Sequence, residues 1–432
     1  MEEKIFNHQN QAPLPSGGVG GGSFDKIVER RGTGCVKWDA EFPFGIDDSE
    51  REGLIPLWVA DMDFEVAPAI REALQKRVEH GVFGYTTVQN NYYEAVIRWF
   101  ERRHNWTIQR EWIQYTTGVV PAISAVIKAL TMPGERVLIL TPVYNCFFSS
   151  IRNNGCEVVE SPLVVRSSGV QEFRSSENLS SLLVPPSSIY EVNWSDFEIK
   201  CADEKTTVFL LCNPHNPAGR VWTREELQRM NEICLRHHVR VVSDEIHCEL
   251  VMPGHHFTPF GTVNPATDAT APIICSSPSK SFNIAGLQMA NIICADPETR
   301  RRIDRAININ EICDVNPFAP LAVEAAYNEG EAWLDALNEY IFGNYQALCE
   351  FFAKNLPQLK VFQLEGTYLA WIDIAATGLS ADEFEEKLLR EAHVWVNSGT
   401  MYGTDGYIRI NLATQRSRLM EGLRRIEKFL NR

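Results

Sequence analysis

The chain has 432 residues, 44% hydrophobic and 22% charged, which is typical of a globular protein with two or three domains. Its 41 basic and 56 acidic residues give a formal net charge of −15. That charge argues against a nucleic-acid partner, since such binders carry a basic footprint. No apolar run approaches the roughly 18 residues that a membrane span needs, so we expect no membrane partner.

The amino-terminal segment resembles a tail and not a secretion signal. Its first residues, MEEKIFNHQN, lack an apolar core. The Pro/Gly/Ser-rich stretch QAPLPSGGVGGGS lacks the spacing of a nucleotide-binding loop, and no strand precedes it. We therefore expect a flexible tail over residues 1–23. The eleven cysteines are scattered without a C-x-x-C pair, which predicts reduced thiols in a cytoplasmic protein.

Helices and strands alternate from residue 66 to about 310. Proline and glycine punctuation, apolar spacing and a capping box (Thr223 with Glu226) predict helices over 68–81, 89–104, 120–130 and 224–238. Short apolar runs predict buried strands at 136–140, 206–212, 239–243 and 271–275. This alternation predicts an α/β fold with a mainly parallel sheet flanked by helices.

Two further regions differ from this alternation in their sequence composition and pattern. The serine-rich segment 165–195 predicts an excursion outside the sheet. Beyond residue 310, helical runs, the strand-like TYLAWIDI and GYIRINLA, and a capping box (Ser380 with Glu383) predict a smaller α+β domain. We expect an N-terminal arm and part of the small domain at 24–65, a large cofactor-binding domain at 66–310, and a small domain at 311–432.

Four predicted strands end in polar residues suited to one ligand. These residues are Tyr144, Asn216, Asp244 and Lys280. In open α/β sheets, ligands bind beyond the carboxyl ends of the strands. A lysine, a carboxylate, an aromatic ring and an amide at that edge match pyridoxal 5'-phosphate. Lys280 would form a Schiff base with its aldehyde, Asp244 would keep its ring nitrogen protonated, Tyr144 would stack on the ring, and Asn216 would donate to the phenolic oxygen.

The cofactor's phosphate needs free N–H groups at a helix start. The stretch TTGVVPAI offers Gly118, for close approach, and the amides of Val119 and Val120. The hydroxyls of Ser277 and Ser279 are also close in sequence to the lysine.

Several residues allow a second interpretation. Tyr144 could be an ordinary core aromatic, and His247 could be a structural histidine or a cofactor contact. Asp244 and His247, near His255 and His256, have a spacing seen in metal sites. No further carboxylate or cysteine cluster completes such a site, so we predict no metal. The aromatic residues of PLWVADMDF (56–64) favour a core role over a substrate cage.

Several motifs carry a family resemblance over roughly residue 24 to the end. NPHNPAG (213–219), SDEIH (243–247) and SPSKSFNIAGL (277–287) resemble the fold-type I, class I/II aminotransferase superfamily, whose members depend on pyridoxal phosphate. KWD, PLWVADMDF, GYT, TGVVPAI and DEIHCEL are similar to the MalY/PatB-type branch. Typical members of that branch are cystathionine β-lyases and related C–S lyases. The resemblance implies a fold-type I pyridoxal-phosphate-dependent transferase fold.

The resemblance also implies roles for further residues. Arg409, in YIRIN, would grip the substrate α-carboxylate, beside Asn216, although strand alternation does not say which face looks inward. Tyr85, in GYT, would reach the cofactor phosphate and substrate in a neighbouring subunit, which implies a homodimer with shared sites. His247 stands where many superfamily members have tyrosine, and Gln288 where many have a phosphate-binding arginine. The phosphate would then depend more on amides, serines and Tyr85.

The expected reaction is β-elimination from cystathionine or a related L-cysteine S-conjugate. Lys280 would remove the α-proton, Asp244 and Tyr144 would support the cofactor, and the products would be a thiol, pyruvate and ammonia. Transamination of an L-amino acid is the alternative, since it shares every step up to α-proton removal. A non-catalytic regulator that retains the cofactor fold is a further alternative, although no DNA-binding extension is evident.

Overall fold

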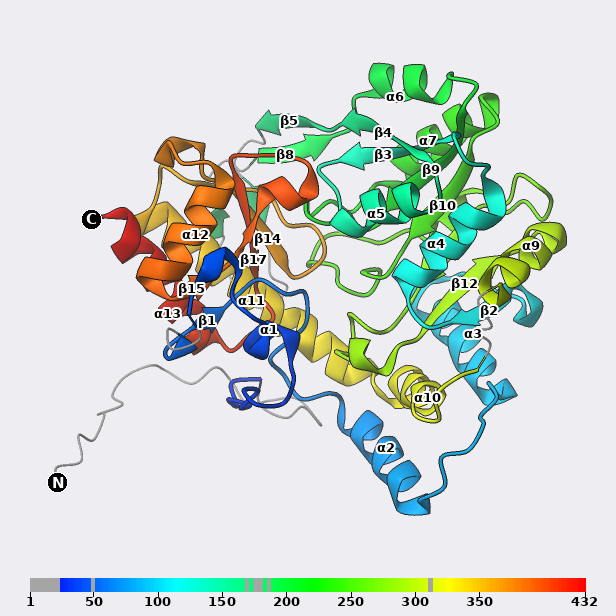
Figure 1. Cartoon of the computed structure of the whole chain (residues 1–432), viewed down its shortest axis with the longest axis horizontal. Coiled ribbons are helices and arrows are strands. Elements are labelled where there is room, and N and C mark those ends of the chain that lie inside the picture. Colours follow the sequence, from blue (N-terminus) through cyan, green and yellow to red (C-terminus); the bar gives the residue numbers. More distant parts are fainter. Residues whose placement is uncertain (1–23, 48–50, 168–170, 174–181, 185–187, 310–313) are drawn as a thin grey trace.

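A seven-stranded sheet forms the centre of the larger of two lobes, and a four-stranded sheet lies in the smaller lobe (Figure 1). The computed structural model describes residues 24–47, 51–167, 171–173, 182–184, 188–309 and 314–432. The predicted tail 1–23 lies outside these residues. The large sheet has the order β2 (Ile113–Thr116), β12 (Ala290–Cys294), β11 (Ile273–Ser276), β10 (Arg240–Asp244), β9 (Thr206–Cys212), β3 (Arg136–Thr141) and β4 (Glu157–Pro162).

The predicted mainly parallel sheet is confirmed. Strands β11, β10, β9, β3 and β4 run parallel to one another, whereas β12 is antiparallel to both β11 and β2. The four predicted strands are β3, β9, β10 and β11, with bounds that differ by at most two residues from those expected. Parallel neighbours end at the same edge of the sheet, which gathers the residues that follow them.

Helices cover both faces of this sheet, as expected for parallel strands. Alternate strand residues explain the two layers: Val137 and Ile139 pack with one buried cluster, and Leu138 and Leu140 pack with another. The first layer contains α4 (Val119–Leu130), α5 (Asn145–Asn153) and α9 (Pro297–Asn308), and the second contains α3 (Asn90–His104), α6 (Trp194–Cys201), α7 (Arg224–Arg236), α8 (Phe260–Val263) and α10 (Ala319–Glu329).

The predicted helix boundaries have the expected local causes. Helix α2 (Pro68–His80) ends at Gly81, whose φ of 75° is a left-handed value that glycine adopts without strain. Helix α7 opens with the predicted capping box, in which Thr223 accepts from the Glu226 amide and Glu226 accepts from the Thr223 amide. Ser380 and Glu383 cap α12 (Ala381–Ala392) in the same way.

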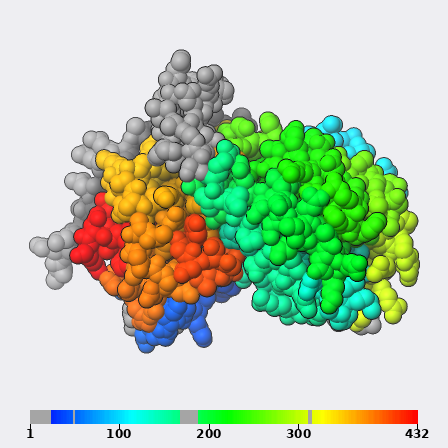
Figure 2. All heavy atoms as spheres, turned by 90° about the horizontal axis from the view of Figure 1, so that it is seen from above, coloured from blue at the N-terminus to red at the C-terminus, as the bar shows by residue number. Residues whose placement is uncertain are grey.

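The smaller lobe combines both ends of the described chain, shown in blue and orange-red in Figure 2. Its sheet has the order β13 (Lys360–Val361), β14 (Leu369–Asp373), β17 (Tyr407–Asn411) and β16 (Asn397–Ser398). Strand β1 (Ile55–Pro56) pairs with β15 (Val394–Trp395), which ties the N-terminal arm to this lobe. Its helices are α1 (Val36–Asp39), α12 and α13 (Arg416–Leu430), with α11 (Glu331–Asn355) leading from the larger lobe.

The serine-rich segment lies partly outside the described residues. Its described parts form two-stranded pairs apart from the large sheet: β5 (Val164–Ser167) with β8 (Ser188–Glu191), and β6 (Gln171–Phe173) with β7 (Leu182–Val184). Among the described residues, no helix is both long and apolar enough to cross a membrane. The domain boundaries at residues 66 and 310 stay a prediction.

Candidate active site

A cavity of about 380 Å³ lies at the carboxyl edge of the parallel strands. The strand register explains its composition, because Cys212, Asp244 and Cys275 are aligned across β9, β10 and β11. Residues that follow these positions therefore emerge side by side. The structure brings the following predicted residues together around the cavity: Lys280, Asp244, Asn216, Tyr144, His247, Ser279, Gly118, Val119, Val120 and Arg409.

Lys280 lies in the cavity with its amine held by a backbone carbonyl. Its Nζ donates to the Ala60 oxygen at 2.6 Å, and the Tyr368 hydroxyl donates to the same oxygen at 2.9 Å. Burial lowers the pKa of Lys280 to about 8. A lysine with this pKa has a substantial neutral fraction near neutrality, and the neutral amine is the form that attacks carbonyl carbons and accepts protons.

Asp244 is a buried carboxylate that forms no ion pair with any of the basic side chains that the structure describes. It is 3% exposed, and the Ile246 amide donates to its Oδ1 at 3.1 Å. Burial raises the pKa of Asp244 to about 7, and Lys280 offsets this rise only in part. A buried carboxylate with a raised pKa is stabilised in its charged form when a ligand brings a cation next to it, and a protonated pyridine nitrogen is such a cation. This property fits pyridoxal phosphate.

Arg409 is a buried guanidinium that lines the cavity, which identifies the strand face that sequence alternation left undecided. It is 3% exposed and donates to Asn216 Oδ1 at 3.1 Å and to the Trp58 carbonyl at 2.9 Å. It also stacks over the Tyr402 ring at 4.8 Å. None of the described carboxylates forms an ion pair with it. A buried cation without a carboxylate partner is suited to an anionic ligand.

The start of α4 is suited to a phosphate group. Gly118 caps the helix, and Val119 and Val120 are its first residues, whose amides have no partner within the helix. Ser279 also lines the cavity. Ser277 does not, because its hydroxyl donates to the Met289 carbonyl at 2.6 Å. The expectation that the Ser277 hydroxyl meets the cofactor is therefore not supported by its placement.

The remaining predicted residues differ in their placement. Tyr144, at the start of α5, lines the cavity, and burial raises the pKa of its phenol. Burial and the nearby Lys280 and Arg409 lower the pKa of His247 to about 3, which keeps its ring neutral. Tyr85 is 98% exposed and lies outside the cavity of its own chain. The cofactor contacts of these residues stay predictions.

Residues that sequence reasoning did not single out complete the cavity. Trp58 lines it and also packs, partly buried, against the core cluster that contains Trp395, so the expected core role of the PLWVADMDF aromatics holds in part for Trp58 and in full for Phe64, which is 6% exposed. Ala60 acts through its carbonyl, which carries no sequence signal. Asn411 fixes the backbone next to Ala60, because its side-chain amide donates to the Asp61 carbonyl at 2.7 Å.

One cluster of potential metal ligands lies away from this cavity, at His104, Cys248 and Glu249. The Glu249 carboxylate already accepts from Trp99 Nε1 and His104 Nε2, both at 2.6 Å, and from Arg103 at 3.3 Å. Arginine and tryptophan donors occupy its oxygens, so the cluster is better explained as a buried hydrogen-bond network than as a metal site.

Comparison with known proteins identifies relatives over nearly the whole chain. Residues 52–426 match the family model described as "Aminotransferase class I and II". Cystathionine beta-lyase PatB of Bacillus subtilis is 39% identical, over 95% of this chain and all of the relative. Protein MalY of Escherichia coli is 32% identical, over 93% of this chain and 96% of the relative.

A solved structure agrees with these relatives. The crystal structure of cystalysin from Treponema denticola, which contains a pyridoxal 5'-phosphate cofactor, superposes with a TM-score of 0.84 at 33% identity. The match covers 95% of this chain and 98% of cystalysin. The predicted fold and the predicted resemblance to the MalY/PatB-type branch are confirmed, and the chain belongs to the aminotransferase class I and II family.

Proposed function

We propose that the protein is a pyridoxal-phosphate-dependent carbon–sulfur β-lyase that acts on cystathionine or a related L-cysteine S-conjugate. The observation that carries this proposal is the convergence of Lys280, Asp244 and Arg409 on one cavity. The similarity to PatB, a cystathionine beta-lyase, supports the choice of reaction. When bound, the cofactor supplies an electron-withdrawing ring that weakens the substrate's Cα–H bond.

The chain's own residues would hold the cofactor by its distinct groups. Asp244 would pair with the ring nitrogen, and Tyr144 would pack on the ring face. Asn216 uses its Oδ1 on Arg409, which leaves its Nδ2 amide to donate to the phenolic oxygen. Gly118, Val119 and Val120, with Ser279, would hold the phosphate, and neutral His247 would act as a hydrogen-bonding neighbour.

Arg409 and Lys280 would have separate roles toward the substrate: Arg409 would bind its carboxylate, and Lys280 would accept its α-proton. Arg409 would bind the α-carboxylate with its Nη groups, which fixes the amino acid and directs its Cα toward Lys280. Neutral Lys280 would accept the Cα proton on Nζ, and the Ala60 carbonyl would stabilise the resulting ammonium through the 2.6 Å contact. The C–S bond then breaks, and the thiolate leaves with the bonding electron pair. Hydrolysis of the remaining fragment yields pyruvate and ammonia.

A steady-state assay with L-cystathionine tests the reaction. Formation of pyruvate without any keto-acid acceptor supports the lyase. Strict dependence on an acceptor would favour the aminotransferase alternative, which the family description also allows. Borohydride reduction followed by peptide mapping should place a pyridoxyl label on Lys280, and a label on another lysine would contradict the assigned site.

We further propose a homodimer in which Tyr85 reaches the partner's cavity. Tyr85 is 98% exposed, and the neighbouring Val82 and Phe83 are 63% and 51% exposed, a large apolar exposure for one short segment. Mixing inactive Lys280→Ala chains with impaired Tyr85→Ala chains tests this. Each mixed dimer would contain one intact site, so activity should recover. Mixed chains that exchange but stay inactive would contradict the shared site.

We also propose a cytoplasmic location, which the cysteines support. The ten cysteines in the described parts of the chain are all free thiols, most of them buried. Free thiols persist in reducing compartments. Fractionation of the source cells with an antibody to the protein would test this location.

A further inference from the structure

One wall of the active-site cavity carries no charge. Among the described residues that line the cavity, one group has only apolar, aromatic or amide side chains. These residues are Trp58, Val59, Asn145, Asn397, Met401 and Tyr402. With the α-carboxylate on Arg409 and Cα at Lys280, the substituent on the substrate's sulfur would lie against these side chains, which together are called the wall.

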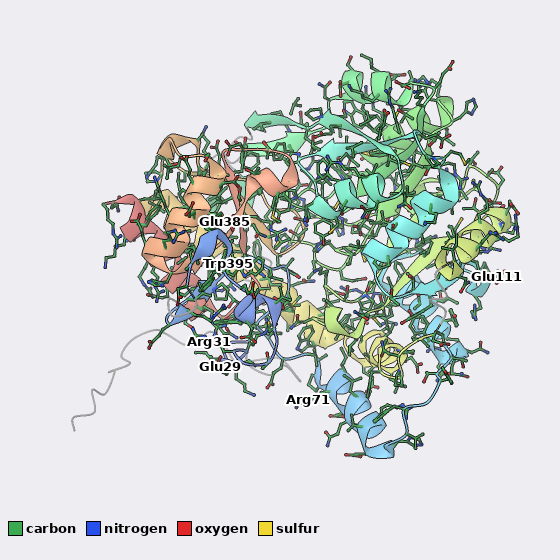
Figure 3. All side chains as sticks on the ribbon, viewed as in Figure 1. Glu29, Arg31, Arg71, Glu111, Glu385 and Trp395 are labelled. Atoms are coloured by element: carbon green, nitrogen blue, oxygen red, sulfur yellow. The ribbon has the colours of Figure 1, made fainter. Side chains whose placement is uncertain are left out.

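Trp58 is held rigidly in the wall. Its ring stacks on Trp395 at a centroid distance of 4.0 Å and an angle of 11°, and its Nε1 donates to the Lys37 carbonyl at 3.1 Å. Trp395 is fixed in turn, because its Nε1 donates to Glu385 at 3.0 Å. Trp395 and Glu385 lie side by side in the smaller lobe (Figure 3). The wall is therefore preorganised.

The same residue also orients the carboxylate anchor. The Trp58 carbonyl accepts from Arg409 Nη2 and from Asn397 Nδ2, both at 2.9 Å. The ring that stacks on Trp395 and the carbonyl that positions the guanidinium thus belong to one residue, and that residue lines the cavity. This arrangement fixes the distance between the substrate's carboxylate and the surface that its side chain meets.

The described lining residues offer no second cation for a charged substituent. Lys280 and Arg409 are its only permanent cations, and both have assigned roles. Burial lowers the pKa of His247 to about 3, so its ring stays neutral. The segment around Tyr85, GVFGYTTV, contains no charged residue, so the arm of a second copy would add aromatic surface and no charge.

We propose that the preferred substrate is an L-cysteine whose sulfur carries an uncharged alkyl or aryl substituent, and that Trp58 determines this specificity. The inference rests on the proposed lyase function. The leaving group of cystathionine carries its own ammonium and carboxylate, and placing these against an apolar wall without partners costs free energy. An alkyl or aryl group instead buries apolar surface on Trp58 and Met401.

Comparison of kcat/KM for S-benzyl-L-cysteine, S-butyl-L-cysteine and L-cystathionine tests this with the cofactor-loaded enzyme. Pyruvate is measured without a keto-acid acceptor. We expect the uncharged conjugates to be preferred by about tenfold or more, the range over which pocket contacts discriminate substrates. An equal or greater kcat/KM for cystathionine would overturn the inference and leave the lyase function standing. Absence of pyruvate from all three conjugates would overturn both.

A variant that introduces a charge tests the proposal without replacing Trp58, whose loss could disturb folding. Met401, 41% exposed, stands at the cavity, and Met401→Arg supplies the missing cation. We expect the ratio of kcat/KM for cystathionine to that for S-butyl-L-cysteine to rise about tenfold. Met132→Arg is the matched control, because Met132 is 68% exposed and lies outside the cavity. An equal rise in both variants, or no rise in Met401→Arg, would overturn the proposal.

A binding measurement adds a readout without turnover. Calorimetric titration of the cofactor-loaded enzyme with 4-phenylbutyrate and with adipate compares an apolar tail with a charged one on the same carboxylate anchor. We expect 4-phenylbutyrate to bind more tightly, and Trp58→Ala to remove most of that difference. Tighter binding of adipate to the unaltered protein would contradict the proposed wall.

Discussion

Replacing Asp244 by asparagine should stabilise the cofactor-free protein in a pH-dependent way. Burial raises the pKa of Asp244 from 3.8 to about 7, so the folded protein binds this proton more tightly than the unfolded chain does. Stability from this group is therefore lost as pH rises from about 4 through about 7. At about 1.36 kcal/mol per pH unit, the charged carboxylate costs the folded protein roughly 4 kcal/mol above pH 7.

The Asp244→Asn variant keeps the acceptor for the Ile246 amide but removes that charge. Its free energy of unfolding, measured by urea titration of the cofactor-free protein, should equal that of the unaltered protein near pH 4. Above pH 4, the variant's free energy of unfolding should exceed that of the unaltered protein by a margin that grows up to about pH 8. The same variant should bind the cofactor about thirtyfold more weakly, the loss expected for a charge-assisted hydrogen bond of about 2 kcal/mol.

The neighbouring Glu245 provides a matched control. Burial raises its pKa to about 8, but its carboxylate accepts from the Phe260 amide and Ser243 and lies outside the cavity. Glu245→Gln should change the pH dependence of stability in the same direction and leave cofactor affinity unaltered. A pH-independent difference between Asp244→Asn and the unaltered protein would refute the reasoning, as would undiminished cofactor affinity.

Other predictions concern the amine and the carboxylate anchor. In the cofactor-free protein, reaction of Lys280 with an amine reagent should rise with pH around a midpoint near 8, since burial lowers its pKa; a midpoint near 10.5 would contradict this. Tyr368→Phe removes a donor that competes for the Ala60 carbonyl, so this carbonyl should hold the Lys280 ammonium better and the midpoint should rise. Tyr345→Phe is the control, because the Tyr345 hydroxyl donates to the Phe362 carbonyl instead; this variant should leave the midpoint unchanged. Arg409→Lys should raise KM roughly tenfold or more with a smaller effect on kcat, because lysine cannot form the bidentate contact; an unchanged KM would exclude the assigned anchor.

Local patterns in the sequence were sufficient for four neighbouring strands of the seven-stranded sheet and for the residues that follow them. Short apolar runs indicated strands β3, β9, β10 and β11, and the rule that parallel strands end together placed Asn216, Asp244 and Lys280 at one edge. Capping boxes and Gly81 marked helix ends, because these signals depend only on residues a few positions apart.

Contacts between distant segments were decided by the tertiary structure alone. Arg409 meets Asn216 across 193 positions, and Lys280 meets the Ala60 carbonyl across 220. Strand alternation shows that a side chain has a face, but the packing of one lobe against the other decides what that face meets. A backbone carbonyl has no side-chain signature, and the ring of Trp58 is fixed by stacking on Trp395, which lies far along the chain. For these reasons most residues of the cavity that could hold a cofactor were readable in the sequence, whereas the wall proposed to select the substrate was not.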